Sequence, residues 1–285
     1  MDVKCYILYN PFAGNGGSEA TARKLADCAE YEGAEIVAMT EIGSYAEFLA
    51  DKQDASLIIC GGDGTLNRFI NDIGDLPHGD VYYMASGSGN DFLRDLGITV
   101  QTEPILINKY IEKLPVCEVG GKKFKVLNGV GYGIDGYCCM LGDAMKEQQI
   151  KKIDYTAIAI GGLLGKYKPC GGRITVDGES RTYKKIWIAP AMNGRFYGGG
   201  IMPCPEQDRL AGDGNIACCV VYGTSRLQTL LIFPSLFKGE HTKHVKNVDL
   251  RVGKRITVEF DSPRPLQIDG ETIKDVTKFS MYYEN

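Results

Sequence analysis

The sequence predicts an α/β protein of two domains: an N-terminal open, mainly parallel α/β sheet over residues 1–97, and a mainly β, sandwich-like domain over residues 98–285. Two observations support this prediction. Apolar strand-like runs alternate with helical patterns through the first hundred residues, as expected for parallel strands with crossover helices. After residue 97, short strand-like segments follow one another across Gly, Pro and Asp turns, with few helical stretches among them. We also consider that the C-terminal tail returns to the first domain.

The first domain begins with a predicted strand at residues 4–9, which leads into a loop of turn-forming residues at 10–17. Ser18 is then expected to cap a helix that runs to about residue 31, since serine accepts hydrogen bonds from free N–H groups at helix starts. Strands and helices continue to alternate, with further strands expected at residues 35–39, 56–60 and 81–84 and a helix at 45–51.

A glycine-rich acidic turn, Gly61-Gly-Asp-Gly-Thr65, follows the most apolar of these strands. The strand at 56–60 has the continuous apolar character of a strand buried on both faces. The three glycines can adopt positive φ and allow a ligand close to the backbone, and Thr65 is expected to cap the next helix. A strand, a glycine turn and a helix N-terminus together favour phosphate binding.

Two interpretations of this turn remain open from the residues alone. Many α/β proteins contain such a turn only because the chain must reverse tightly there. Asp63 favours a ligand site, because a carboxylate in a phosphate cradle needs a cation, a ribose hydroxyl or a backbone donor beside it; this suggests a nucleotide with Mg²⁺. Ligands of parallel sheets bind beyond the carboxyl ends of the strands, so the loops at 10–17, 61–65 and 86–91 are expected to meet at one site.

The second domain is predicted from short strand-like segments at residues 125–128, 173–176, 184–189, 216–222, 256–260 and 266–268. Two stretches, 135–167 and 224–238, have helical patterns instead. The first carries an apolar run beside four lysines, Lys151, Lys152, Lys166 and Lys168. That combination suits a bilayer surface, although a helix that packs on its own sheet also explains it and is the simpler interpretation.

Composition limits the setting of the protein. No basic and apolar leader precedes the first strand, and the longest apolar stretch, residues 155–165, falls short of the roughly 20 residues that span a bilayer. We therefore expect a cytoplasmic protein that meets a membrane only peripherally. The ten cysteines form no CxxC pair, so we expect reduced thiols that mostly fill the core. His241 and His244 are expected to be a surface pair rather than a metal site.

Charge is distributed unevenly along the chain. Residues 1–100 contain 6 Lys+Arg against 16 Asp+Glu, whereas residues 101–285 contain 26 against 20. The basic half could face anionic lipid headgroups or nucleic acid. An ordinary solvated surface would produce the same asymmetry.

An ordered set of motifs resembles the catalytic domain of the bacterial soluble diacylglycerol kinases and related lipid kinases, which is itself similar to that of sphingosine kinases. The resemblance spans nearly the whole chain. The GGDGT turn alone is less specific, because NAD kinases share it. The motifs are Asn10-Pro-Phe-Ala-Gly14, Gly61-Gly-Asp-Gly-Thr-Leu-Asn67, Gly87-Ser-Gly-Asn-Asp-Phe-Leu-Arg94, Gly198-Gly-Gly-Ile-Met-Pro203, Gly212-Asp-Gly214 and Gln267-Ile-Asp-Gly-Glu271.

The resemblance implies an ATP- and Mg²⁺-dependent kinase that phosphorylates a lipid hydroxyl, with diacylglycerol as the expected acceptor. It implies a structural Mg²⁺ at Asp213, with main-chain oxygens of Leu210 and Asn215. It assigns proton acceptance to Glu271, with Asp269 beside it. The chemistry of the residues, independently of the resemblance, places Asp63 near the nucleotide's Mg²⁺. The implied ATP site comprises Asn10, Pro11, Gly14, Thr40, Gly61, Gly62, Gly64, Thr65, Leu66, Asn67, Ser88, Asn90 and Asp91.

The chemistry of the residues is compatible with this implication. Phosphoryl transfer mainly requires positioning and charge neutralisation, and a carboxylate beside the attacking hydroxyl is enough to accept its proton. Taken alone, the segment 269–271 also suits a plain β-turn. The expected partners are a lipid substrate at the membrane surface and no nucleic acid, with a homodimer possible. An NAD kinase and a catalytically silent lipid- or nucleotide-binding regulator remain the alternatives.

Overall fold

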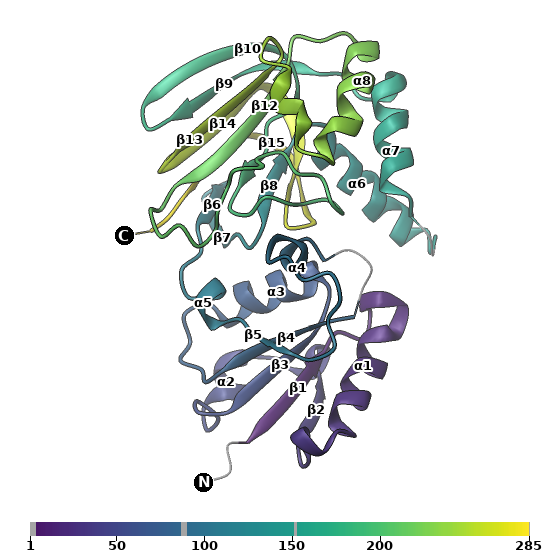
Figure 1. Ribbon diagram of the computed structural model, residues 1–285, viewed down its shortest axis with the longest axis vertical. Helices are drawn as coiled ribbons and strands as arrows, with labels where there is room; N and C mark the ends of the chain where they lie inside the picture. The colour runs from purple at the N-terminus through teal and green to yellow at the C-terminus, as the bar shows by residue number, and fades with distance from the viewer. Residues whose placement is uncertain (1–3, 87–89, 151–152, 285) are drawn as a thin grey trace. The chain divides into compact units, whose positions relative to one another are not determined.

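The computed structural model describes residues 4–86, 90–150 and 153–284, and the chain divides into two compact units, Met1–Lys113 and Leu114–Asn285 (Figure 1). The predicted class, an α/β sheet followed by a β-rich part, is confirmed. Residues 98–113 lie in the first unit because strand β5 (Ile105–Leu106) pairs with β4 (Val81–Ala85). The C-terminal segment forms strand β15 (Glu271–Tyr282), which lies within the second unit.

A five-stranded sheet with the order β2-β1-β3-β4-β5 forms the first unit. Strand β1 (Cys5–Tyr9) pairs in parallel with β2 (Glu35–Ala38) and β3 (Ser56–Gly61). Strand β3 is parallel to β4, and β5 is antiparallel to it. The order reverses at β1, so the loops after β1 and β3 leave the sheet at the switch point where such sheets bind ligands.

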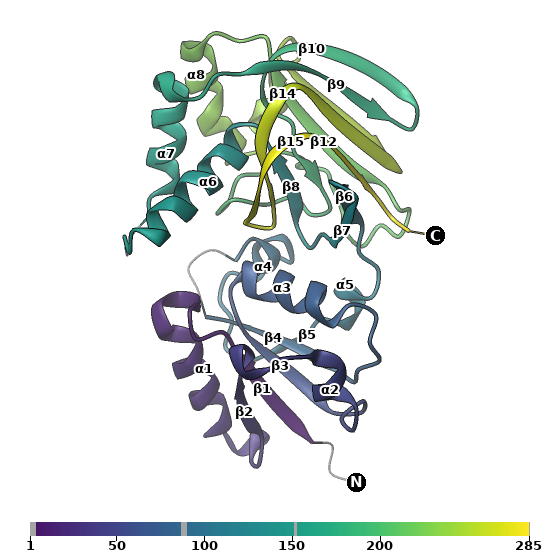
Figure 2. The same cartoon turned by 180° about the vertical axis from the view of Figure 1, so that it is seen from behind.

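Helices cover both faces of this sheet (Figures 1 and 2). Helix α1 (Gly17–Ala26) lies on one face, and α2 (Tyr45–Leu49) and α3 (Asp63–Ile73) lie on the other. Strand β3 is buried as its apolar run predicts, and Ile58 and Cys60 pack against α1. Shorter elements complete the unit: α4 (Asp91–Asp95), α5 (Asn108–Ile111), η1 (Ala13–Gly16), η2 (Ala29–Tyr31) and η3 (Met39–Glu41).

The predicted start and length of α1 were wrong. The helix ends at Ala26, and its N-cap residue is Gly16, which has a positive φ. Ser18 lies inside the helix, where its Oγ is 2.6 Å from Oγ of Ser86. The serine therefore links the start of α1 to the loop after β4 and does not cap the helix.

Among the described residues of the second unit, ten strands form one sheet in the order β7-β6-β15-β14-β8-β11-β12-β10-β9, with β13 paired to β12. Strand β9 also pairs with β14, which joins the end of this order back to its middle. The bounds of the strands other than β15 are β6 (Val116–Val119), β7 (Lys122–Lys125), β8 (Gly129–Tyr132), β9 (Cys170–Val176), β10 (Glu179–Ile188), β11 (Ala191–Met192), β12 (Ile216–Tyr222), β13 (Val248–Gly253) and β14 (Arg255–Ile268).

Two strand predictions in this unit were wrong. The strand expected at 125–128 does not exist, because β7 ends at Lys125 and β8 begins at Gly129. The segments expected at 256–260 and 266–268 are parts of the single strand β14. Register shifts on both sides of Arg264 accommodate the intervening prolines, since bulges allow proline within a strand.

Helices of the second unit pack on this sheet around a core that includes Trp187, Ile188 and Cys219. The predicted helical stretch 135–167 contains α6 (Ile134–Glu147), α7 (Tyr155–Gly161) and a π-helical turn, η4 (Gly162–Lys166). Lys151 and Lys152 lie outside the described residues. The stretch 224–238 contains α8 (Arg226–Leu236), which Ser225 caps with Gln228 in a capping box. A short 3-10 helix, η5 (Glu240–Lys243), follows.

The cysteine prediction is confirmed and the histidine prediction is not. All ten cysteines, which lie within the described residues, are free thiols, and six of them are buried. His241 is fully buried and its Nε2 lies 2.8 Å from the Pro203 carbonyl oxygen, so it is not a surface residue. Within residues 4–86, 90–150 and 153–284, no helix is long and apolar enough to cross a membrane.

Candidate functional site

The loops after β1, β3 and β4 meet at one edge of the first sheet, as expected from their sequence positions. Asn10 Nδ2 donates to Thr65 Oγ1 at 3.2 Å, which joins the loop after β1 to the first turn of α3. The Ser86 N–H donates to the Gly61 carbonyl at 3.0 Å, which joins the ends of β3 and β4. The first N–H groups of α3 have no partner within the helix itself, so a positively polarised helix start lies at this junction.

The glycines of the turn act differently from the prediction. Neither Gly61, Gly62 nor Gly64 has a positive φ. A Cβ on Gly61 would lie 2.4 Å from Cβ of Thr65, whereas a Cβ on Gly62 would have no neighbour within 4 Å. Gly62, not Thr65, is the N-cap of α3. Gly61 is therefore needed for close packing against Thr65, which leaves Thr65 in place to accept from Asn10.

Asp63 is occupied by backbone donors. Its Oδ2 accepts from the N–H groups of Asp91 at 2.6 Å and Phe92 at 3.4 Å, at the start of α4. Negative charge at a helix N-terminus is stabilising. Of the partners considered for this carboxylate, the structure shows the backbone donor, and the contact joins the loop after β3 to the loop after β4.

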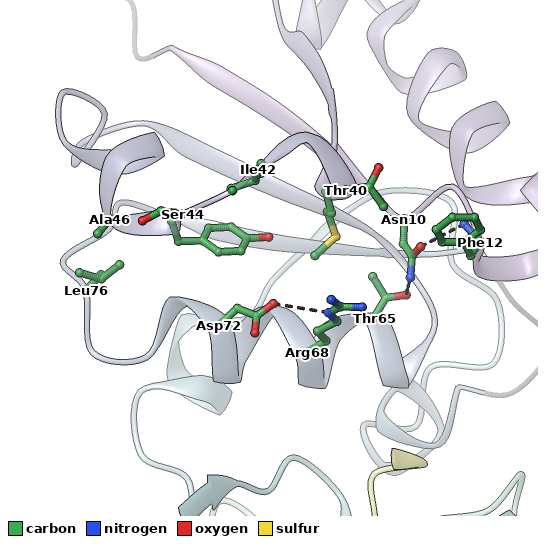
Figure 3. A pocket seen from close by; sticks show the side chains of 13 residues that line it. Asn10, Phe12, Thr40, Ile42, Ser44, Ala46, Thr65, Arg68, Asp72 and Leu76 are labelled. Carbon is green, nitrogen blue, oxygen red and sulfur yellow. Dashed lines mark hydrogen bonds and ion pairs between the residues drawn. The ribbon is translucent and has the colours of Figure 1, made fainter. Parts of the chain in front are cut away.

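A pocket of about 480 Å³ opens beside this junction, entirely within the first unit (Figure 3). That volume lies in the range of small-molecule sites. Its wall combines apolar side chains with polar and charged ones, among them the Arg68–Asp72 ion pair at 3.5 Å. The lining residues are Asn10, Phe12, Met39, Thr40, Ile42, Gly43, Ser44, Tyr45, Ala46, Thr65, Arg68, Asp72 and Leu76.

Three residues of the proposed nucleotide set, Asn10, Thr40 and Thr65, line this pocket. Leu66 and Asn67 are buried in α3, where the Leu66 N–H donates to the Gly62 carbonyl. Asn90 accepts from the Tyr83 hydroxyl, and Asp91 is buried at the start of α4. Among the others, Gly61 ends β3, Gly62 is the N-cap of α3 and Gly64 lies in the first turn of that helix. Pro11 and Gly14 lie in the segment after β1, and Ser88 lies outside the described residues.

The late Asp-Gly-Glu segment is a tight hairpin in the second unit. Asp269 and Gly270 both have positive φ, as a two-residue type I′ turn requires, and Ile268 pairs with Glu271 across it. The Asp269 carboxylate accepts from the N–H groups of Leu127, Asn128 and Gly129 at 2.6, 2.8 and 3.0 Å. Burial raises the pKa of Asp269 to about 6, although these three hydrogen bonds oppose the shift.

Asp269 thus holds the hairpin, and Glu271 is the exposed carboxylate beside it. The residue after Glu271 is also fixed, because Thr272 Oγ1 donates to Asp143 Oδ2 at 2.7 Å. Lys146 Nζ lies 2.9 Å from the other oxygen of Asp143. Helix α6 therefore holds the first residues of β15 on the far side of the turn from Asp269.

Sequence reasoning missed Asp135, which lies at the start of the same helix α6. It is half-buried, and its Oδ2 accepts from the Tyr197 hydroxyl at 2.7 Å. Burial raises the pKa of Asp135 to about 6, against the opposing effect of the Tyr197 hydrogen bond. The signal in the sequence was a carboxylate residue between two glycines, Gly133 and Gly136. A Cβ added at either glycine would collide with backbone atoms, those of Trp187 for Gly133 and those of Pro265 for Gly136.

The proposed metal residues lie in one loop of the second unit. Asp213 is exposed, its Oδ1 accepts from the Asn215 N–H at 2.9 Å, and these contacts lower its pKa, so the carboxylate is ionised. The Asn215 carbonyl accepts from Gln207 Nε2 at 3.1 Å. Carboxylate and carbonyl oxygens suit Mg²⁺. The described residues contain no group of three or more His, Cys, Asp or Glu side chains that could hold a metal ion.

Comparison with known proteins gives two family matches. Residues 4–119 match the diacylglycerol kinase catalytic domain, and residues 128–280 match the YegS C-terminal NAD kinase beta sandwich-like domain. A diacylglycerol kinase of Mycobacterium tuberculosis is 23% identical over 274 residues, which cover 90% of this chain and 85% of that protein. A diacylglycerol kinase of Staphylococcus saprophyticus is 24% identical over 284 residues, covering 95% and 90%.

Solved structures agree on the fold. The crystal structure of a diacylglycerol kinase from Bacillus anthracis superposes with a TM-score of 0.66 at 22% sequence identity, and the match covers 98% of this chain and 93% of that one.

Proposed function

The chain belongs to the family of bacterial diacylglycerol kinases and related lipid kinases, and on that premise we propose that it transfers the γ-phosphate of ATP to the hydroxyl of diacylglycerol, giving phosphatidic acid. One observation carries the proposal. The carboxyl ends of β1 and β3 flank a helix N-terminus, and a pocket of nucleotide size opens beside it. Asn10, Thr40 and Thr65 line that pocket.

The proposed nucleotide site uses the first unit. The N-terminus of α3 and the Asn10–Thr65 pair receive the phosphates, because backbone N–H groups and the helix dipole favour an anion there. The apolar lining near Ile42 and Leu76 receives the base. Asp63 keeps the phosphate-side loops together through its contacts with α4. Loops joined in this way place the γ-phosphate, and positioning is most of what phosphoryl transfer requires of a protein.

The proposed acceptor chemistry uses the second unit. Glu271 takes the proton of the attacking hydroxyl, as a carboxylate within hydrogen-bond reach of that group can. Asp269 is a positioning residue, since both of its oxygens are occupied by main-chain donors of residues 127–129. Asp143 holds Thr272 on the other side. Glu271 therefore lies between two residues, Asp269 and Thr272, whose side chains are held by hydrogen bonds.

Mg²⁺ would supply neutralisation of phosphate charge when bound with the nucleotide. Sites of this kind commonly provide one or two carboxylates and leave the remaining positions to phosphates and water. A second Mg²⁺ is proposed to bind Asp213 and the carbonyls of Leu210 and Asn215. Arg209, the residue before this loop, donates to the Leu127 carbonyl at 3.0 Å. Order in the metal-binding loop would therefore help to hold residues 127–129, whose N–H groups donate to Asp269.

The proposed setting is the cytoplasmic face of a membrane, which the protein contacts peripherally to reach its lipid. Labelled γ-phosphate from ATP tests the acceptor when it is offered with diacylglycerol vesicles and, separately, with NAD. Label in the lipid extract supports the proposal, and label in NAD with none in lipid would favour an NAD kinase. Absence of transfer to either acceptor, with ATP binding intact, would favour a silent regulator.

A further inference from the structure

Two helical segments of the second unit expose an unusual amount of apolar surface. Leu164 in η4 is 65% exposed, and Leu227 and Leu231 in α8 are 68% and 72% exposed. Ile160 and Phe237 are also exposed nearby in these segments. We call these five residues the leucine face. Single exposed apolar residues are ordinary, whereas several on neighbouring helices mark an interaction surface.

The two segments are joined to one another. The Arg226 guanidinium at the start of α8 donates to the carbonyls of Leu163 at 2.9 Å and Tyr167 at 2.9 Å, at the end of the α7–η4 segment. Figures 1 and 2 show α7 and α8 side by side on the second unit. The exposed residues of η4 and α8 therefore belong to neighbouring surfaces.

The segments also carry little charge. No charged residue occurs from 155 to 165, and Arg226 is the single charged residue from 226 to 237. Helix α8 is already buried through Ile232 and Leu236, yet its outer side presents Leu227 and Leu231. A helix that is apolar on all sides belongs in a core or in contact with lipid. Packing on its own sheet accounts for the inner side of α8 and leaves the outer side unexplained.

Exposed lysines border the leucine face. Lys166 ends η4, Lys168 follows it, and Lys238 follows α8. Lys185 is near the start of α8, because its carbonyl accepts from the N–H of Gly223, two residues before the cap. Apolar side chains with lysines around them suit the interface of a bilayer that contains anionic lipid.

We propose that the leucine face docks on the surface of an anionic bilayer, with Leu164, Leu227 and Leu231 inserted below the headgroups and the bordering lysines among them. The inference rests on the proposed function, which puts the acceptor in a bilayer, and it goes further by assigning the contact to these two helices. The sequence suggested only a general attraction between the basic half of the chain and anionic headgroups, whereas the leucine face is a specific contact surface.

Vesicle flotation without nucleotide tests the surface independently of catalysis. We would compare the parent chain with Leu164→Gln/Leu231→Gln on phosphatidylcholine vesicles with and without phosphatidylglycerol. The matched control is Val245→Gln/Val252→Gln, since these valines are 77% and 59% exposed in the same unit but outside the leucine face. Thermal unfolding of each variant verifies that it is folded.

Each leucine is expected to contribute about tenfold to partitioning, since burying one such side chain is worth at least a factor of that size. The leucine double variant should therefore bind anionic vesicles roughly a hundredfold more weakly, and the valine control should bind like the parent. Lys166→Glu/Lys168→Glu should weaken binding to anionic vesicles alone, and added salt should reduce that difference.

Flotation of the folded leucine variant at the parent's level would overturn the proposal. A change of oligomeric state in that variant, measured by sedimentation with vesicle binding unaltered, would instead assign the face to contact between two copies of the chain. Failure of the proposed function is separate: a protein that floats through the leucine face but transfers no phosphate to diacylglycerol would contradict the kinase assignment alone.

Discussion

Replacement of Gly61 by alanine tests how the glycine turn is built. The added Cβ would lie 2.4 to 2.7 Å from Cβ, Cγ2 and Oγ1 of Thr65. Thr65 is buried in the first turn of α3 and cannot remain where it is. Overpacking at such a site costs about 1–3 kcal/mol. Displacement of Thr65 would also break its hydrogen bond from Asn10, which is worth about 1 kcal/mol.

Gly62→Ala is the matched control in the same turn. Its Cβ would meet no atom within 4 Å, and its φ of −99° suits any residue. Alanine is a poorer N-cap than glycine, which destabilises the folded chain, but it also reduces the freedom of the unfolded chain, which has the opposite effect. We therefore expect the free energy of unfolding to change by no more than about 0.5 kcal/mol. Urea unfolding measures both variants, and titration with ATP should show weaker binding for Gly61→Ala. Equal stability of the two variants, or a greater loss for Gly62→Ala, would refute this account of the turn.

Two further predictions concern the second unit. The pKa of Asp135 is raised from 3.8 to about 6 by burial, so between these pH values the folded chain keeps a proton there that the unfolded chain loses. The stability that this group contributes is therefore full below about pH 4, and it falls by about 3 kcal/mol as the pH rises through 6. Asp135→Asn cannot titrate, so urea unfolding from pH 4 to 7 should show a pH dependence smaller by that amount; an unchanged dependence would contradict the assignment. Ser225→Ala removes the cap of α8 and should cost about 1 kcal/mol in thermal or urea unfolding. The Gln228 side chain, which is exposed, supplies the reciprocal contact of the capping box. Ser225→Thr keeps a hydroxyl at the cap, and a threonine variant that is no more stable than Ser225→Ala would count against the capping role.

Regular elements of the first unit could be predicted because each carries its own signal. The continuous apolar run of β3 predicts a doubly buried strand, and its observed burial agrees. The capping interaction of Ser44 with the Glu47 N–H is likewise local. The start of α1 was wrong because a serine near a helix start is only a weak sign of the cap when a glycine with positive φ can take that position.

Roles that depend on distant partners could not be predicted. The sequence alone allows Asp269 to be a turn residue or a catalytic carboxylate. Only the fold brings it to the N–H groups of residues 127–129, some 140 positions away. For Asp63 the sequence leaves a cation, a ribose hydroxyl and a backbone donor open as partners, and only the fold brings the N–H groups of α4 to its carboxylate. His241 appears exposed in a polar segment, and the Pro203 carbonyl that it meets lies 38 positions earlier.

Prolines misled the strand prediction for a different reason. Pro263 and Pro265 indicate a break in the chain, because proline cannot donate to a sheet. In β14 the pairing with β15 shifts register between Glu259 and Arg264 and again before Leu266. These irregularities remove the need for donors at the prolines. One strand therefore continues where the residues alone indicate two.

The central claim is that a chain with this nucleotide pocket phosphorylates a lipid hydroxyl through Glu271. The most direct measurement is the kcat for phosphatidic acid formation from ATP and vesicle-embedded diacylglycerol, compared between the parent chain and Glu271→Gln. Asp275→Asn is the control, since it neutralises another exposed carboxylate of β15. The account predicts that Glu271→Gln lowers kcat by about 10²- to 10⁴-fold with ATP affinity unchanged, and that the control retains the parent's kcat. Parental turnover by Glu271→Gln would contradict it.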